Sequence, residues 1–599
     1  MSGEPLPTAT RQIKLRFDEK GDPAFSSVKG PESFKQHARG ILPPPDVIPV
    51  IFIPGVMGSN IRQIKGKKKV WAPPNGKVSG IGAGISGAWG SAKGNHSLFD
   101  VDNTEVDPTG PCVVNINNYW LDKEEARIRK WGTLHADSYH AFLDKLEEQL
   151  NEQYIEPGVK DSPLISQIGM LEYLSGGASK TEDCHAFGPK RKPDYASHAQ
   201  EAMKAWEAQP KALTKNEIKR LGDYYFPVWA FGYNWLRSLE EAASELIDYI
   251  NNTVFKRYEG KYFRHQNKVI FITHSMGGLV GRRAAQMAPD KVLGVVHGVQ
   301  PVMGAPLLYR RYRSGIETNG FFDIPGFVFS HVAGSNEKKV AAQIATAPGP
   351  LQLAPTCDHE PDWLKIVFET KTLKESSGIF NPAVKQQGDV IFTAPKTDPY
   401  TEIYSKTTDD CWWGLVNPVN LDLSGRFKKD GLNPLKIYQS VVQEAKRFHS
   451  TLKKYAHPMT YGFYGNDDDK YRTFGHVTWE IPELKGCALR PEQLAYVQAT
   501  EFSSGAVKLS VPFYDTNDRS VYVGTVAKTV EAKLSNKRNQ SGDGTVSLHS
   551  GAWLEKLEPK PQEVFTFPGF DHQGAYNYRY AAELTIYFIA RITQKAKPV

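Results

Sequence analysis

Residues 268–281 constrain the fold of this chain more than any other stretch, and they read KVIFITHSMGGLVG. The apolar run 269–272 is mostly β-branched or aromatic, which suits a strand that is buried on both faces. A turn of small residues around Ser275 comes next, and a helix-compatible run then continues to Met287 and stops before Pro289. The stretch therefore predicts a buried strand, a tight turn and a helix in immediate succession.

A serine at the centre of such a turn is the pattern of a nucleophile elbow. The turn needs small residues, because the serine backbone is strained and the helix passes close to the strand. Gly277 fills the required position two residues after the serine, whereas Thr273 stands at the earlier position where glycine is usual. Threonine is still small, so we interpret Ser275 as a candidate nucleophile, with His274 beside it as a wall of the pocket.

Strand and helix patterns alternate on either side of this turn. Strands are expected at 47–53, 226–231, 269–272, 292–299, 459–464 and 564–567, and helices at 138–150, 236–249, 279–287, 434–456 and 578–592. This alternation predicts the α/β class, with a mostly parallel, doubly wound sheet that has helices on both faces.

The segments between these elements lose the alternation and are rich in loops. We expect an N-terminal arm over 1–46 and one domain over 47–599. Its core would comprise 47–62, 126–150, 222–306, 434–465 and 541–599, and the insertions 63–125, 151–221, 307–433 and 466–540 would build caps or a lid.

The strand expected at 47–53 runs directly into a glycine-rich turn that contains Gly55. Such a turn exposes backbone N–H groups at the carboxyl end of its strand, where a hydrolase places one donor of its oxyanion hole. The other donor is the N–H that follows the nucleophile, here Met276. We therefore expect the oxyanion hole to consist of Met276 with Val56 or Met57.

A serine nucleophile needs a base and an acid that orients the base, and in a doubly wound hydrolase these follow in the order serine, acid, histidine. Asp543 lies between two glycines in a tight turn, and His572 follows the last expected strand. We expect these two to complete the triad. Asp571 is poorly placed to orient His572, because the side chains of adjacent residues diverge. His549 is a competing base, but it lies only six residues after Asp543 with no obvious strand between them.

Two weaker motifs point to ligands. Residues 78–89 contain a G-x-G-x-x-G match, but no strand precedes it and no helix clearly follows, so we expect a mobile flap or a plain surface loop rather than a dinucleotide site. Asp467, Asp468 and Asp469 are calcium candidates, although the run lacks the glycine and distal glutamate of an EF-hand loop. We expect no other cofactor.

The remaining features of the sequence limit where the chain acts. Its formal net charge of +7 is small for 599 residues, and we expect no nucleic-acid partner. The five cysteines form no C-x-x-C motif, and their odd, scattered set suggests folding in a reducing cytosol. The N-terminus has no apolar segment of a secretory signal peptide, and we find no transmembrane helix pattern.

Several dispersed stretches resemble the lipases of the lecithin:cholesterol acyltransferase and PGAP1-like group. They are FIPGVMGS at 52–59, YNW at 233–235, HSMGGLV at 274–280, LQLAP at 351–355, YGFYG at 461–465 and GDGTV at 542–546. Within that group the overall length, the opening stretch PLPTATRQI…GILPPPDVIPVIF and the large insertions are most similar to the type VI secretion lipase effectors, fourth family.

The resemblance implies an α/β-hydrolase with cap modules that cleaves phospholipid esters of rival cells, with phospholipase A1 favoured over A2. It implies Ser275 as nucleophile, Asp543 as acid and His572 as base. It also implies a phospholipid membrane, an immunity protein that blocks the cleft or lid and a secretion spike protein as partners, with export from the cytoplasm to the periplasm or membranes of target cells. The alternatives are a general esterase, a hydrolase similar to GPI-inositol deacylases, and a catalytically silent binding protein.

Overall fold

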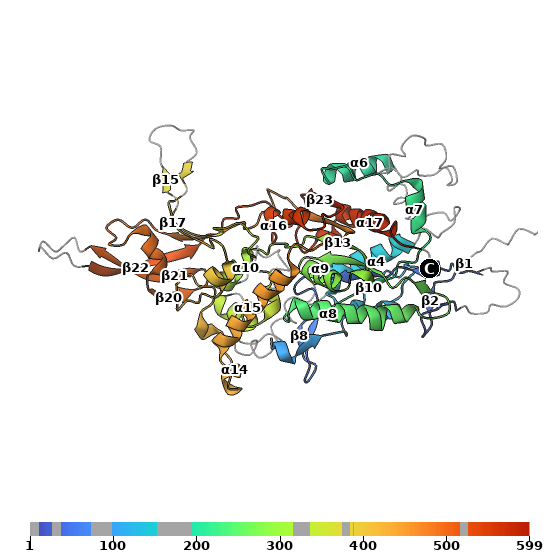
Figure 1. Cartoon of the computed structure of the whole chain (residues 1–599), viewed down its shortest axis with the longest axis horizontal. Coiled ribbons are helices and arrows are strands. Elements are labelled where there is room, and N and C mark those ends of the chain that lie inside the picture. The colour runs from blue at the N-terminus through green and yellow to red at the C-terminus, as the bar shows by residue number, and fades with distance from the viewer. Residues whose placement is uncertain are drawn as a thin grey trace, which may run out of the picture.

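A computed structural model of the chain describes residues 11–26, 38–72, 99–151, 195–315, 336–369, 371–373, 384–386, 388–514 and 525–597. Two six-stranded sheets dominate these residues, and Figure 1 shows them at opposite ends of the molecule. We call the sheet that contains the strand before Ser275 the core sheet, and the sheet whose strands lie within residues 364–534 the cap sheet.

The core sheet has all of its neighbouring strands parallel. In spatial order its strands are β10 (Val228–Ala230), β6 (Val50–Ile53), β12 (Val269–His274), β13 (Val292–Gly298), β18 (Thr460–Gly465) and β23 (Glu563–Phe567). Chain order reverses next to β6, because β10 lies on one side of it and β12 on the other. Ligands of doubly wound sheets bind beside the carboxyl ends of strands at such a switch point.

Helices cover both faces of this sheet (Figure 1). They are α4 (Ala136–Asn151), α8 (Leu239–Tyr249), α9 (Gly277–Met287) and α17 (Arg579–Thr593), and α15 (Pro434–Leu452) packs against α9. Successive residues of β6 alternate between the faces: Ile51 and Ile53 join the hydrophobic cluster that contains residues of α8 and α9, and Val50 and Phe52 join that of α4 and α17. Burial on both faces explains why the core strands are apolar runs in the sequence.

The cap sheet is mixed. In spatial order its strands are β17 (Val390–Ala394), β14 (Leu364–Phe368), β19 (Val477–Ile481), β22 (Thr525–Leu534), β21 (Ala506–Tyr514) and β20 (Ala499–Ser503). Only the pair β14–β19 is parallel, and the other four pairs are antiparallel. Helix α10 (Leu307–Ser314) packs against β19 and also against α12 (Glu337–Ile344).

Smaller elements complete the described part of the fold. A three-stranded antiparallel sheet contains β8 (Lys69–Trp71), β7 (Ile61–Gln63) and β9 (Thr104–Val106). Further helices are α3 (Lys123–Ile128), α6 (Tyr195–Ala205), α7 (Lys215–Leu221), α13 (Pro348–Leu351), α14 (Arg426–Lys429) and α16 (Leu548–Ala552). The two-stranded pairs are β1–β4 (Arg11–Gln12, Ala38–Arg39), β2–β3 (Arg16–Phe17, Pro23–Ala24), β5–β11 (Asp46–Val47, Arg264–His265) and β15–β16 (Lys371–Leu373, Val384–Gln386).

Part of the segment expected to be an N-terminal arm packs on the core. Leu15 is buried, and the Phe17 ring lies 6.1 Å from that of Tyr225 and 5.4 Å from the guanidinium carbon of Arg129. The division of the chain into an arm, a core and insertions stays a prediction.

Candidate functional site

The turn between β12 and α9 holds Ser275 in a strained conformation. Its φ angle is +52°, in the left-handed region that non-glycine residues rarely adopt, and its N–H donates to the carbonyl of Gly298 at 3.0 Å. At Gly277 a Cβ would lie 2.4 Å from the carbonyl oxygens of both Ile53 and Pro54. The glycine is therefore required so that the start of α9 can pass close to the end of β6.

Thr273 fits at the position where glycine was expected because the helix opposite it supplies the space. A Cβ on Gly281 of α9 would lie 2.8 Å from the Thr273 Cγ2 methyl. The Thr273 hydroxyl is 2.7 Å from His297 Nδ1, which gives this buried polar group a partner. Because Gly281 has no side chain, threonine fits at position 273 in place of the usual glycine.

Ser275, His572 and Asp543 meet in one line of hydrogen bonds. The Oγ of Ser275 lies 2.8 Å from His572 Nε2, and His572 Nδ1 lies 2.7 Å from Asp543 Oδ2. Ser275 and Asp543 are buried, and the His572 side chain is 12% exposed. A base that reaches a hydroxyl at this distance, with its second nitrogen on a carboxylate, has the geometry of an activated serine.

The Asp543 carboxylate is fixed by the turn that carries it. Its Oδ1 accepts the N–H groups of Thr545 at 3.0 Å and Val546 at 2.7 Å, which leaves Oδ2 facing His572. The two alternatives lie elsewhere: Asp571 is exposed and accepts the N–H of Gly574, and His549 Nε2 lies 3.3 Å from Glu360 Oε1. The structure therefore places Asp543, not Asp571, and His572, not His549, next to Ser275.

The glycine-rich turn after β6 borders the same serine. A Cβ on Gly55 would lie 3.0 Å from Ser275 Cβ, so only glycine lets the two turns approach so closely. Met57 has a φ of +62°, and its carbonyl accepts the indole N–H of Trp71 at 2.6 Å. Among the residues that the structure describes, no acceptor takes the N–H of Met276, Val56 or Met57. The prediction that Met276 with Val56 or Met57 forms the oxyanion hole needs such uncommitted donors.

His274 hydrogen-bonds to two other residues near the elbow. It is buried, and burial, followed by the charge of His572, lowers its pKa to about 3, so the ring is neutral. Its Nε2 lies 2.8 Å from the carbonyl oxygen of His572, and its Nδ1 lies 3.1 Å from the Tyr139 hydroxyl.

The calcium candidates have other partners. Asp467 Oδ1 accepts the N–H groups of Asp469 and Tyr471 at 3.0 and 2.9 Å, and its Oδ2 accepts that of Gly569 at 3.2 Å. Burial raises the pKa of Asp467, but these N–H groups outweigh it and the pKa is lowered. Asp468 pairs with Arg472. Within the described ranges, no group of three or more His, Cys, Asp or Glu side chains could hold a metal ion.

Sequence reasoning missed the tyrosines around the elbow. Tyr139 lies within the helix predicted at 138–150, where no role was assigned to it, yet its hydroxyl contacts His274. The Tyr576 hydroxyl donates to the carbonyl of Thr273 at 2.9 Å. No spacing signal distinguishes such tyrosines from core residues, because their rings are buried and only one oxygen carries the polar contact.

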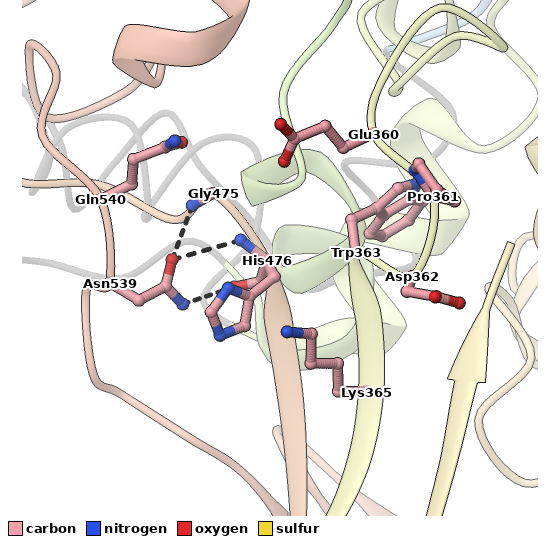
Figure 2. Close-up of a pocket in the computed structure, with 9 residues that line it drawn as sticks. All are labelled: Glu360, Pro361, Asp362, Trp363, Lys365, Gly475, His476, Asn539 and Gln540. Carbon is pink, nitrogen blue, oxygen red and sulfur yellow. Dashed lines mark hydrogen bonds between the residues drawn. The ribbon is translucent and has the colours of Figure 1, made fainter. Parts of the chain in front are cut away.

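A separate cavity of about 120 Å³ lies beside the start of β14 (Figure 2). It is lined by Glu360, Pro361, Asp362, Trp363, Lys365, Gly475, His476, Asn539 and Gln540. None of the triad residues lines it, although Gln540 is three residues before Asp543 in the chain. Figure 2 shows the Asn539 side chain bonded to the backbone of Gly475 and His476, so this amide shapes the cavity wall.

Two sequence expectations concern membranes. The glycine-rich segment 78–89, predicted as a flap or surface loop, lies outside the described residues. In the part of the chain that is described, every helix is too short or too polar to cross a bilayer.

Comparison with known proteins finds a likeness at the level of structure. A chain of the crystal structure of the Tle4–Tli4 complex is similar with a TM-score of 0.64 and 26% sequence identity, over 93% of this chain and 100% of that chain. No family model matches the sequence, and no curated protein matches it. Together with the all-parallel core sheet, the likeness confirms the predicted fold class, an α/β-hydrolase fold.

Proposed function

We propose that this chain is a serine hydrolase that cleaves carboxylic ester bonds of membrane phospholipids. The observation that carries the proposal is the hydrogen-bonded line from Ser275 Oγ through His572 to Asp543, with distances of 2.8 and 2.7 Å. The unbonded N–H groups beside Ser275 support it further, because acyl transfer needs donors where negative charge develops.

In the first half of the reaction, His572 Nε2 takes the hydroxyl proton while Ser275 Oγ bonds to the ester carbonyl carbon. The carbonyl oxygen becomes an oxyanion that accepts the N–H of Met276 and that of Val56 or Met57. When the carbonyl re-forms, the ester C–O bond breaks and His572 returns its proton to the departing lysophospholipid. Asp543 stabilises the imidazolium throughout.

In the second half, water replaces the lysophospholipid. His572 takes a proton from the water as its oxygen attacks the acyl-enzyme, and it then protonates Ser275 Oγ as the fatty acid leaves. The reaction needs no redox or metal cofactor. We propose the phospholipase A type and favour A1 specificity, on the resemblance stated from the sequence.

We propose further that the chain is an antibacterial effector of a type VI secretion system. The structural likeness to the Tle4–Tli4 complex supports this role and supports a dedicated partner, since that structure is a complex of two proteins. The partner would be an immunity protein that blocks the active-site cleft. A spike protein would carry the effector from the producing cytoplasm to the periplasm and membranes of target cells.

The test has two steps. A fluorophosphonate probe should label the wild-type chain, and Ser275→Ala should abolish both labelling and fatty-acid release from mixed phospholipid vesicles, a loss of several orders of magnitude. Ser440→Ala, at an exposed serine of α15, is the matched control and should leave both unchanged.

Labelling that persists in Ser275→Ala would refute the nucleophile. Release of fatty acid from short soluble esters but not from vesicles would refute the phospholipid substrate while keeping the mechanism. The ratio of the two lysophospholipid isomers would decide between A1 and A2 cleavage.

A further inference from the structure

Tyr139 and His274 connect the two turns of the candidate site through buried side chains. Tyr139 comes from α4, which packs on one face of the core sheet, and His274 is the last residue of β12. Each is only 1% exposed. Their rings lie 5.6 Å apart between centroids, and that of His274 lies 5.2 Å from the ring of His572.

The direction of each hydrogen bond follows from its partners. The carbonyl oxygen of His572 can only accept, so His274 Nε2 carries the hydrogen. Because the ring is neutral, Nδ1 keeps its lone pair and accepts the Tyr139 hydroxyl at 3.1 Å. The Tyr139 oxygen in turn accepts the N–H of Gly55 at 3.4 Å and bonds the Gln573 side chain.

The result is a continuous relay: Gly55 N–H to Tyr139, Tyr139 O–H to His274 Nδ1, and His274 Nε2–H to the His572 carbonyl. Aligned hydrogen bonds polarise one another, so the loss of one weakens the others. At one end the relay holds the turn that carries Val56 and Met57. At the other end it holds the backbone of His572.

The backbone of His572 is thereby fixed on both sides of its Cα. Its N–H donates to the carbonyl of Asp543 at 2.8 Å, and its carbonyl accepts from His274 at the same distance. His274 is covalently next to Ser275, so this bond ties the base directly to the residue before the nucleophile. Asp543 orients the imidazole, and His274 sets how far that imidazole lies from Ser275 Oγ.

We propose that Tyr139 and His274 are positioning residues that act on both halves of the reaction centre, by setting the Ser275–His572 distance and by orienting the Gly55 turn. The inference rests on the proposed hydrolase function. Neither residue needs to touch the substrate or exchange a proton with it. Loss of the relay should therefore slow the chemical steps and leave ester binding nearly unchanged.

The test measures kcat and KM for a soluble p-nitrophenyl ester with the full chain. Tyr139→Phe deletes one oxygen and should lower kcat about 10- to 100-fold, because small misplacements of catalytic groups have effects of this size. KM should stay within about twofold, since binding in the ground state does not use the relay. His274→Leu should lower kcat at least as much.

Three comparisons separate positioning from mere packing. Tyr576→Phe is the matched control: this tyrosine is about equally buried, and its hydroxyl bonds the carbonyl of Thr273 on the elbow strand rather than the His274 ring. Its kcat should fall less than about threefold. His274→Gln keeps an N–H donor near the Nε2 position and should recover most of the kcat that His274→Leu loses. The double variant Tyr139→Phe/His274→Leu should lose less than the product of the two single losses, because both changes break the same Tyr139–His274 hydrogen bond.

The proposal is overturned if Tyr139→Phe matches the wild-type kcat, if Tyr576→Phe loses as much as Tyr139→Phe, or if the two losses add in the double variant. If His274→Leu fails to fold, the test compares the kcat of Tyr139→Phe and His274→Gln with that of Tyr576→Phe. Absence of ester turnover in the wild type would refute the hydrolase function itself. Turnover that is the same in the wild type and in Tyr139→Phe would refute only the positioning role.

Discussion

The core sheet and the cap sheet have the same number of strands, but they differ in how their residues are buried. Every residue of β6, β12, β13 and β18 in the core sheet is buried. In the cap sheet, β21 alternates between buried and more exposed residues along its length, and the first five residues of β22 are exposed. The core sheet has helices on both faces, whereas these cap strands leave side chains open to solvent.

This difference determines where precise chemistry can be built. Ser275 follows β12 and His572 follows β23, whereas Asp543 lies in the turn 541–546, called the acid turn here, whose backbone N–H groups fix its carboxylate. The cap contributes no member of the triad, yet Asp543 sits on the segment that returns from β22 to the core. The reacting groups therefore lie in the core, and Asp543 is the one among them that follows a cap strand in the chain.

The largest expected effect on activity comes from changing Asp543 in the acid turn. Asp543→Asn keeps the shape of the turn but loses the carboxylate that faces His572 Nδ1, so kcat should fall by about 10⁴-fold. Asp571→Asn, a neighbouring exposed carboxylate, should stay within about threefold of wild type. Initial rates on phospholipid vesicles measure both, and equal losses would contradict the pairing.

A smaller effect tests whether the cap is a separate unit of stability. Arg313 of α10 is buried, donates to the carbonyl of Trp412 at 3.1 Å and lies 3.8 Å from Glu337. Arg313→Met leaves Glu337 buried without its cation and should cost about 3–5 kcal/mol of unfolding free energy. Calorimetry should then show the cap melting earlier.

The control for that experiment is Arg490→Met, which removes an exposed ion pair with Glu492 and should cost less than about 1 kcal/mol. Fluorophosphonate labelling of Ser275 should persist after the early transition if the core is intact. One unshifted transition in Arg313→Met would show that the buried cation does not stabilise the cap.

Acid should destabilise the core as its buried histidines take up protons. Burial lowers the pKa of His274 to about 3 and those of His140, His449 and His457 to about 4. Because the unfolded chain binds these protons near pH 6.5 and the folded chain does not, stability is full above that pH and falls as pH drops toward 4. Each group contributes about 1.4 kcal/mol per pH unit within this window.

Urea unfolding between pH 7 and pH 5 measures this slope. His140→Gln removes one of these histidines, so its slope should be smaller by about one proton. A stability that does not change over this range would contradict the buried, neutral state of these histidines.

The smallest effect concerns Asp467, which joins β18 to the loop before His572. Asp467→Asn keeps an oxygen for the N–H groups of Asp469 and Tyr471 but turns an amide toward Gly569, so it should cost about 1 kcal/mol and lower kcat less than tenfold. Because N–H groups already occupy this carboxylate, a calcium chelator should leave activity unchanged. A loss that added calcium restores would overturn this reading of Asp467.

The same contrast between the sheets explains what the sequence could predict. The strands of the core sheet were predicted because burial on both faces makes each a short apolar run, and β12 and β18 lie within two residues of the expected ranges. Helix α15 ends at Leu452 rather than 456, because Lys453 has a φ of +49°. Cap strands such as β22, with lysines and threonines on an exposed face, carry a weaker pattern.

The candidate triad was predictable because turn glycines mark Ser275 and Asp543, and chain order marks His572. The fit of Thr273 was not, because it depends on Gly281 across the helix–strand contact. Tyr139 was not predictable either, since its role depends on where α4 packs relative to His274. Such contacts join residues far apart in the chain and leave no local periodicity.

The position of β23 at the edge of the core sheet, as its last strand in chain order, has a consequence for synthesis. Ribosomes make the Gly55 turn and the Ser275 elbow long before they reach His572, which follows β23. During most of translation the serine therefore has no base, and a nascent chain would be inert toward the membranes of the cell that makes it. For the phospholipase proposed above, danger to the producing cell would begin only after β23 has docked, which would also be the earliest moment at which a neutralising partner is needed.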